Sequence, residues 1–185
     1  MYKDIDRIVP ESKDKFFIDT NVWIYICYPT GYRYEWAQEK YDEFLKCSLS
    51  AKSKLFISSL VLAEFCNKCL RLEEKSWLDR YQKPECEKKE FRKTVHYVDA
   101  KKIISTIVEK QILSICDRVP DFFDSIEVMQ MLDPGFKIDY NDLYYLELCR
   151  KLDMAFVTHD SDFTMIQTNV LIISANNKVH RSSFC

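Results

Sequence analysis

Glycine is rare in this 185-residue chain, which contains only Gly31 and Gly135. A Walker A loop or a dinucleotide-binding fingerprint needs two or three glycines within about eight residues, because bare backbone must approach the phosphates closely. Two glycines so far apart cannot share such a loop. The sequence therefore excludes P-loop nucleotide hydrolysis and Rossmann-type cofactor binding.

Long apolar runs are also missing. No run approaches the roughly 18 to 20 residues that cross a bilayer, and charged residues stand near the N-terminus where a signal peptide would be apolar. The eight cysteines are too few for a small disulfide scaffold, which carries about 8–10% cysteine. We therefore expect a cytoplasmic protein with reduced thiols and no membrane partner.

Zinc-binding patterns are absent too. None of the three histidines has a second histidine four residues away, which argues against a zincin. Cys66 and Cys69 form one Cys-x-x-Cys pair, whereas a structural zinc site normally needs two such pairs or added histidines. Their spacing fits one face of a helix, so we expect both to pack in the core.

A positive net charge is lacking as well, because 27 Lys and Arg against 29 Asp and Glu leave −2. A nucleic-acid partner would need local basic residues, and residues 68–93 supply nine Lys and Arg against six Asp and Glu. Aromatic stacking on bases would come from Tyr81 or Phe91. The alternative is a solvated helix pair of mixed charge. The candidate phosphate-binding residues are Lys83, Lys88, Lys89, Arg92 and Lys93.

Short apolar runs alternate with longer amphipathic ones, which is typical of βαβ units around a parallel sheet. The fold class that follows is α/β: a three-layer α/β/α sandwich with a mostly parallel central sheet, in one domain over residues 1–185. A charged helical insertion is expected around residues 68–102. Strands are predicted at 15–18, 55–57, 154–158 and 170–173, and less clearly at 112–116. Helices are predicted at 22–28 (stopped by Pro29 to Gly31), 34–49, 58–70, 103–109, 122–132 and 140–152, with two more in 68–93 separated by Pro84 and a helical turn at 162–166.

Acidic residues follow these predicted strands. Asp19 and Asp160 end two strands, Glu64 lies just over one turn into the helix after a third, and Asp142 lies at a helix start. Ligands of open α/β sheets bind outside the carboxyl ends of the strands. Four carboxylates from four segments are therefore expected to converge at one edge.

Such convergence is costly without a counter-ion. Two carboxylates about 5 Å apart repel by roughly 3 kcal/mol at an effective dielectric constant of 20. Mg²⁺ and Mn²⁺ remove this cost, because hard cations prefer carboxylate oxygens and water. The natural chemistry of such a cluster is metal-assisted hydrolysis of a phosphodiester.

Four segments resemble the motifs of PIN-domain ribonucleases, in the order in which that family has them. The first is Phe17-Ile18-Asp19-Thr20-Asn21, the second runs from Ile57 to Phe65, the third opens with Asn141-Asp142, and the fourth is Thr158-His159-Asp160-Ser161-Asp162-Phe163. The segments span residues 16–173. The third departs from the family in having Leu143-Tyr144-Tyr145 where small residues are usual.

The resemblance implies an endoribonuclease whose Asp19, Glu64, Asp142 and Asp160 hold one or two Mg²⁺ or Mn²⁺ ions. Asp162 is expected to bind through water or to cap the turn at Phe163. The expected partners are an RNA substrate and, because many such proteins are toxins of toxin–antitoxin pairs, a cognate antitoxin protein; homodimers are also common. Asn21 and Thr158 are expected to orient the carboxylates rather than bind the metal.

Each acidic residue also has a structural explanation. Asp19 could cap the following helix, and Glu64 could form a surface ion pair with Lys68 four residues on. Asp139 and Asp142 approximate a capping box, in which Asp139 would be the cap and Asp142 would favour the helix dipole. Thr158 could be merely a strand residue. His159 is expected to point away on the opposite face of its strand.

Two other functions compete with the nuclease. The first is a non-catalytic PIN-like scaffold that binds RNA or protein. The second is a phosphatase with Asp19 as nucleophile, but the second Asp that such enzymes carry two positions on is replaced by Asn21.

Overall fold

The computed structural model describes residues 1–28, 35–135 and 137–177. These residues form a six-stranded, fully parallel sheet with the order β1-β6-β5-β2-β3-β4. The α/β fold class predicted from the sequence is confirmed. The strands are β1 (Tyr2–Asp4), β2 (Lys15–Ile18), β3 (Lys54–Ile57), β4 (Asp117–Arg118), β5 (Ala155–Val157) and β6 (Ile172–Ser174).

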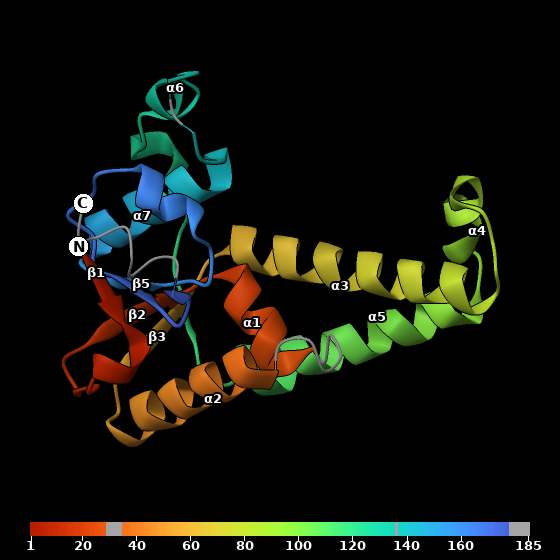
Figure 1. Cartoon of the computed structure of the whole chain (residues 1–185), viewed down its shortest axis with the longest axis horizontal. Helices are drawn as coiled ribbons and strands as arrows, with labels where there is room; N and C mark the ends of the chain where they lie inside the picture. Colours follow the sequence, from red (N-terminus) through yellow and green to blue (C-terminus); the bar gives the residue numbers. More distant parts are fainter. Residues whose placement is uncertain (29–34, 136, 178–185) are drawn as a thin grey trace.

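Helices cover both faces of the sheet. Successive side chains of a strand point to opposite faces, and Phe16 of β2 packs edge-on against Phe44 of α2 (Glu35–Ser50), with ring centroids 5.0 Å apart. Phe17 packs instead against Tyr145 of α7 (Tyr140–Leu152), at 5.6 Å. Figure 1 shows α7 and α2 on opposite sides of the strands. The sheet is thus the middle of three layers. The central strands β2 and β5 are largely buried, whereas both residues of the edge strand β4 are exposed.

The remaining helices link the strands. The helix α1 (Thr20–Cys27) follows β2 directly and packs against α2 and α3 (Ser59–Arg80). Ser58 begins α3 by accepting a hydrogen bond from the Val61 N–H at 3.3 Å. The shorter elements are the 3₁₀ turns η1 (Ile5–Arg7), η3 (Glu85–Glu87), η5 (Phe123–Ser125) and η6 (Asp162–Met165), and the helices α4 (Lys88–Phe91) and α6 (Val128–Met131).

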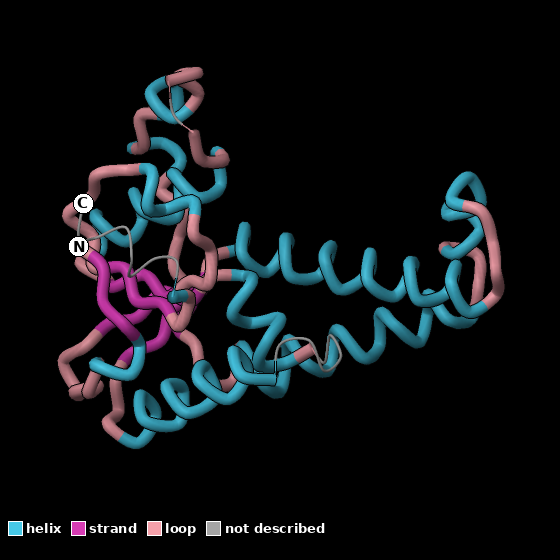
Figure 2. The backbone as a smooth tube through the Cα atoms, in the orientation of Figure 1, coloured by secondary structure: helices cyan, strands magenta, loops and turns pink. Residues whose placement is uncertain are grey.

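A helical arm, consisting of α3, η3, α4 and α5 (Val95–Ile107), extends from the sheet (Figures 1 and 2). The helix α3 runs outward, α4 lies at the far end, and α5 returns beside α3. This arm includes the charged segment predicted at 68–102. None of the helices that the structure describes is both long enough and apolar enough to cross a membrane.

The tip of the arm is built on aromatic packing. Phe91 is only 2% exposed and packs against Trp77 and Tyr97, with ring centroids 5.8 and 5.6 Å apart. The expectation that Phe91 stacks on bases is therefore wrong, because its ring forms the arm's own small core. Tyr81 remains 48% exposed.

Basic side chains of the arm are partly neutralised by local acids. Lys83 pairs with Glu87 at 2.5 Å, and Lys93 pairs with Glu90 at 2.8 Å. Lys88, Lys89 and Arg92, which were also predicted to contact phosphates, are exposed. Much of this segment therefore matches the alternative interpretation, a solvated helix pair of mixed charge.

The prediction of a strand at residues 112–116 is wrong. The helix α5 continues into a π-helical turn, η4 (Val108–Ile112), which buries Ile112 completely, and β4 begins only at Asp117. A short apolar run fits a buried helical segment as well as a buried strand. The periodicity at residues 103–109 belonged to the longer helix.

Two further elements differ from the prediction, one helix and one strand. The helix predicted at 122–132 is reduced to η5 and α6, because Phe122 has a left-handed backbone (φ 54°) and Ile126 is extended. The strand β1 was not predicted, since its polar residues give no apolar run. The predicted helix stop from Pro29 to Gly31 lies outside the described residues.

Candidate functional site

The register of β2 with its two neighbours, β3 and β5, places the residues that follow these strands side by side at one edge of the sheet. Phe17 pairs with Phe56, and Ile18 pairs with Val157. Asp19 then donates its backbone N–H to the Val157 carbonyl at 2.9 Å, which places it beside Thr158. We call this edge, where the strands have their carboxyl ends, the carboxyl edge.

Asp19 lies at the centre of the carboxyl edge. Its side chain accepts a 2.6 Å hydrogen bond from the Thr158 hydroxyl, and it does not cap α1, although it occupies the cap position. The residue is only 4% exposed. Burial, supported by the negative charge of Glu64, raises the pKa of Asp19 to about 6. The capping explanation therefore does not account for this carboxylate.

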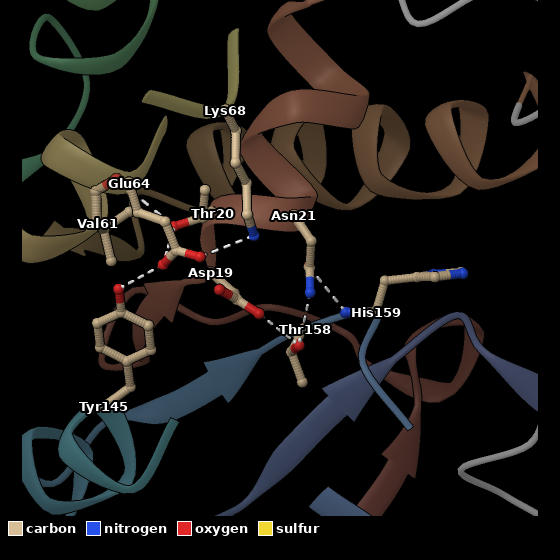
Figure 3. Close-up of polar contacts among 9 residues, drawn as sticks. All are labelled: Asp19, Thr20, Asn21, Val61, Glu64, Lys68, Tyr145, Thr158 and His159. Atoms are coloured by element: carbon tan, nitrogen blue, oxygen red, sulfur yellow. Dashed lines mark hydrogen bonds and ion pairs between the residues drawn. The ribbon is translucent and has the colours of Figure 1, made fainter. Parts of the chain in front are cut away.

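Thr158 and Asn21 form a polar network around Asp19. The Asn21 amide donates to the Thr158 hydroxyl at 3.3 Å, and its carbonyl oxygen accepts from the His159 backbone N–H at 3.1 Å. The Thr158 hydroxyl also accepts from the Asp160 backbone N–H at 3.0 Å. Figure 3 shows these groups between α1 and the loop that follows β5. Asn21 and Thr158 thus tie Asp19 to the segment that carries Asp160.

Glu64 points into the site from α3 and makes three polar contacts. Its Oε2 accepts from the Thr20 hydroxyl at 3.1 Å and from the Tyr145 hydroxyl at 2.9 Å. Its Oε1 pairs with the Lys68 ammonium at 2.7 Å (Figure 3). Burial acts to raise the pKa of Glu64, but these contacts outweigh it and the net pKa is lowered. The predicted pair with Lys68 exists, yet Glu64 faces the site rather than the solvent alone.

Asp142 lies in the first turn of α7, and its pKa is raised further than that of Asp19. Burial, then the charges of Asp19, Asp160, Asp139 and Glu64, raise its pKa to about 8. Asp139 stands at the N-cap of α7 but its side chain makes no capping hydrogen bond. The capping box expected for this pair is therefore not formed. Carboxylates from other segments of the chain therefore act on the charge state of Asp142.

Asp162 stands apart from this group. Its backbone N–H donates to Asp160 Oδ1 at 2.9 Å, and its own side chain is exposed at the start of η6. Asp160 is half-buried. Asp162 thus orients Asp160 through its backbone, and its carboxylate is the outermost of the predicted ligands.

His159 faces away from the acidic residues. Its Nδ1 lies 3.0 Å from the Tyr41 hydroxyl, and its ring packs edge-on against Tyr25. Burial lowers the pKa of the imidazole. Figure 3 shows the ring directed away from Asp19. His159 is therefore not arranged to act as a general base on a group held by the carboxylates.

The donor set of the site suits a hard divalent cation. Asp19, Glu64, Asp142 and Asp160 offer carboxylate oxygens, which are the ligands that Mg²⁺ and Mn²⁺ prefer. Within the described ranges, no three His, Cys, Asp or Glu side chains stand close enough together to surround one ion. The four carboxylates therefore suit a divalent cation chemically. In this structure Asp19 and Glu64 are instead held by hydroxyl groups and by the Lys68 ammonium.

Among the described residues, no cysteine belongs to a cluster that could hold a metal ion. The seven that the structure describes are free thiols, and Cys69 is buried while Cys66 is half-buried. Both lie on α3, as the core-packing explanation predicts. Cys185 lies outside the described residues.

Two hydroxyl groups of the site were not predicted from the sequence. Thr20 and Tyr145 both donate to Glu64, and Tyr145 is completely buried. A signal for Tyr145 existed, since it stands three residues after Asp142 and so shares its helix face. Tyr41 was missed as well; its hydroxyl donates to the Thr158 carbonyl at 3.0 Å and accepts from the Ala175 N–H at 3.1 Å.

Comparison with known proteins gives one family. The profile of the PIN domain matches residues 16–169, which include the residues of the carboxyl edge described above. A solved structure, PAE2754 from Pyrobaculum aerophilum, aligns over 98% of this chain and 96% of its own, with 11% sequence identity and a TM-score of 0.46. No curated protein matches the sequence significantly.

Proposed function

This chain belongs to the PIN domain family, whose fold is of the nuclease type, and we propose that it is a metal-dependent endoribonuclease. The observation that carries the proposal is the electrostatic state of Asp142. Burial, and then the charges of Asp19, Asp160, Asp139 and Glu64, raise its pKa to about 8. A fold maintains such mutual repulsion at a cost, and a divalent cation would remove it.

The residues divide into those that would hold the metal and those that position them. Asp19, Glu64, Asp142 and Asp160 would hold Mg²⁺ or Mn²⁺, with Asp162 as an outer, water-mediated ligand. When bound, the ion supplies an activated water and neutralises the charge that develops on the phosphate and the leaving oxygen.

Positioning falls to neutral side chains. Thr158 fixes Asp19 through its hydroxyl, while Thr20 and Tyr145 fix one oxygen of Glu64. Such hydrogen bonds orient ligands and keep a site geometry reproducible. The attack would be in line on the phosphodiester and would release a 3′ hydroxyl and a 5′ phosphate.

The reaction can be tested with the purified chain and a single-stranded RNA of mixed sequence. We expect cleavage with Mg²⁺ or Mn²⁺, no cleavage with excess EDTA, and products that carry 5′ phosphates. A DNA oligonucleotide of the same sequence is the control for substrate class. Metal-independent cleavage, or products with cyclic phosphates, would argue for a different mechanism.

Two neighbouring acids on α7 provide a matched pair of variants. Asp142→Asn should lower RNA cleavage by about a hundredfold or more, because it removes a charged ligand from the site. Asp139→Asn should retain most activity, since Asp139 stands at the helix cap position. Initial cleavage rates at saturating Mg²⁺ measure both. Equal losses in the two variants would contradict the roles given to them.

The competing functions make different predictions. A non-catalytic scaffold should bind no Mn²⁺ at the carboxyl edge and cleave no RNA. A phosphatase with Asp19 as nucleophile should turn over small phosphate esters. A small neighbouring gene for a DNA-binding partner would indicate a toxin–antitoxin pair, and its absence would favour RNA processing.

A further inference from the structure

Lys68 of α3 forms an ion pair with Glu64 at the carboxyl edge. It follows Glu64 by one helical turn, so both side chains leave the same face of the helix. Its ammonium lies 2.7 Å from Glu64 Oε1. Its positive charge also counts among the influences on buried Asp19 and lowers the pKa of that carboxyl against the larger effect of burial. Figure 3 shows the Lys68 side chain reaching down from α3 to a point beside both carboxylates.

Both oxygens of Glu64 are occupied in this arrangement. Oε2 accepts from two hydroxyl groups, those of Thr20 and Tyr145. Oε1 is held by the Lys68 ammonium. The hydroxyl donors are anchored, because Thr20 and Tyr145 are completely buried. The oxygen most readily freed for a metal ion is therefore the one that Lys68 holds.

Lys68 itself is free to move. Its side chain is 42% exposed, while that of Glu64 is 24% exposed. A lysine side chain has four flexible methylene groups and can leave one partner without any backbone movement. Nothing comparable holds for Thr20 or Tyr145, whose rings and methyl groups are packed in the core.

We propose that Lys68 is a tethered counter-ion that occupies the metal position of Glu64 and Asp19 in the metal-free protein and must swing out when a divalent cation binds. The inference rests on the proposed metal site. It assigns to Lys68 a regulatory role: the ammonium stabilises the empty site and competes with the metal for it.

The arrangement also explains why the carboxylates are not gathered as ligands of one ion. The ammonium holds Glu64 at 2.7 Å and lowers the pKa of Asp19 by its charge, while the hydrogen bond to the Asp19 side chain comes from Thr158. A single positive charge thus neutralises only part of the acidic site. A divalent ion offers more charge and shorter bonds to oxygen, which drives the exchange.

The exchange predicts how metal affinity changes when the ammonium is removed. Lys68→Met keeps a flexible, unbranched side chain that is one atom shorter and removes its charge. We expect Lys68→Met to bind Mn²⁺ about tenfold or more tightly than the unmodified protein, because no charged hydrogen bond must be broken first. Its metal-free melting temperature should fall, and the rise on adding Mn²⁺ should be larger. Lys75→Met, at an exposed position two turns further along α3, is the control.

Titration calorimetry and Mn²⁺ electron paramagnetic resonance measure the affinities without any reference to RNA cleavage. Equal or weaker Mn²⁺ binding by Lys68→Met than by Lys75→Met overturns the inference and leaves the nuclease proposal standing. If neither variant nor the unmodified protein binds Mn²⁺, the metal site itself is wrong and the inference falls with it. Tighter binding by Lys68→Met alone supports both.

A second measurement uses the unmodified protein, so it stands even if Lys68→Met folds poorly. Amine-reactive labelling followed by mass spectrometry reports how available each ammonium is. Mg²⁺ should raise the labelling of Lys68 several-fold and leave that of Lys75 unchanged, because the metal releases Lys68 from Glu64. Unchanged or reduced labelling of Lys68 at saturating Mg²⁺ overturns the exchange.

Discussion

Replacing Asp19 with asparagine is expected to lower Mg²⁺-dependent RNA cleavage by about a thousandfold or more while the protein remains folded. Charge stabilisation by a bound metal contributes several kcal/mol to such reactions, and about 1.4 kcal/mol corresponds to tenfold in rate. Asp19 is the most buried of the four carboxylates and lies at the centre of the carboxyl edge. Its loss therefore removes the ligand that the other segments surround.

The folded state should tolerate this change. Asparagine has the shape of aspartate, and its carbonyl oxygen can accept the hydrogen bond that Thr158 gives to Asp19. The substitution also removes a buried charge that Glu64 opposes. We therefore expect the metal-free melting temperature to stay the same or rise.

Cleavage rates and thermal melting of the same preparations check both parts. Asp79→Asn, at an exposed position near the end of α3, is the control for loss of an aspartate elsewhere. Full RNA cleavage by Asp19→Asn in Mg²⁺ would remove the basis of the nuclease assignment. Unfolding of the variant would show that Asp19 is a structural residue instead.

Stability of the metal-free protein is expected to fall as the pH rises from about 5 to about 9. Folding raises the pKa of Asp19 to about 6 and that of Asp142 to about 8, while an unfolded aspartate titrates near 3.9. Between these values the native state holds protons that the unfolded state has released. Stability then decreases with increasing pH, and the loss is complete above the folded pKa of Asp142.

Glu64 contributes with the opposite sign and at lower pH. Its pKa is lowered in the folded state, so its contribution is present above its unfolded pKa and is lost only as the pH falls. His159 also opposes the decline, because burial lowers its pKa and its contribution to stability rises with pH near the ordinary histidine value of about 6.5. The net decline between about pH 5 and pH 9 therefore belongs to Asp19 and Asp142.

Thermal melting at several pH values, with and without Mg²⁺, measures this dependence. Mg²⁺ should restore stability most at high pH, where the carboxylates are charged and the ion has most to neutralise. Asp142→Asn should flatten the metal-free profile, because it removes the group with the higher pKa. A metal-free melting temperature that is constant or rises over this range would show that folding does not raise the pKa values of Asp19 and Asp142.

The parallel sheet could be predicted because each central strand is a short apolar run followed by a polar residue. Phe16 to Ile18 and Phe156 to Val157 fit this pattern, and both strands lie in the middle of the sheet. The strand β1 could not be recognised, since Tyr2, Lys3 and Asp4 lie at the edge and give no apolar run.

Helical segments were harder where local pattern and tertiary packing disagree. The segment around Ile112 has the apolar content of a strand, but it completes the helix of the arm through a π-helical turn. The role of Phe91 depended on where the tip of the arm folds back, because only the packed structure brings Trp77 and Tyr97 to its two sides.

The common edge of the acidic residues could be predicted because parallel strands place their carboxyl ends together, but no three acidic side chains of the described residues lie close enough to surround one ion. Asp19 and Asp160 follow neighbouring strands, and the charge of each acts on Asp142. Their roles as metal ligands stay a prediction. The spacing of Tyr145 from Asp142 was a signal that both share one helix face, but the contacts of the Thr20 and Tyr145 hydroxyl groups with Glu64 depend on how α1 and α7 are rotated against the sheet.

Lys68 illustrates how two explanations can both hold. The sequence offered an ion pair with Lys68 as the alternative to a functional Glu64. In the structure Glu64 makes that pair and also faces the buried hydroxyl groups of the site. Only the rotation of α3 could show that the pair lies at the carboxyl edge.

Anomalous diffraction from crystals of the protein soaked in Mn²⁺ would locate any metal bound at the carboxyl edge. We expect a manganese peak within bonding distance of carboxylate oxygens of Asp19, Glu64, Asp142 and Asp160, whether one ion or two are bound. A peak confined to other residues, or no peak at a Mn²⁺ concentration that supports RNA cleavage, would contradict this expectation.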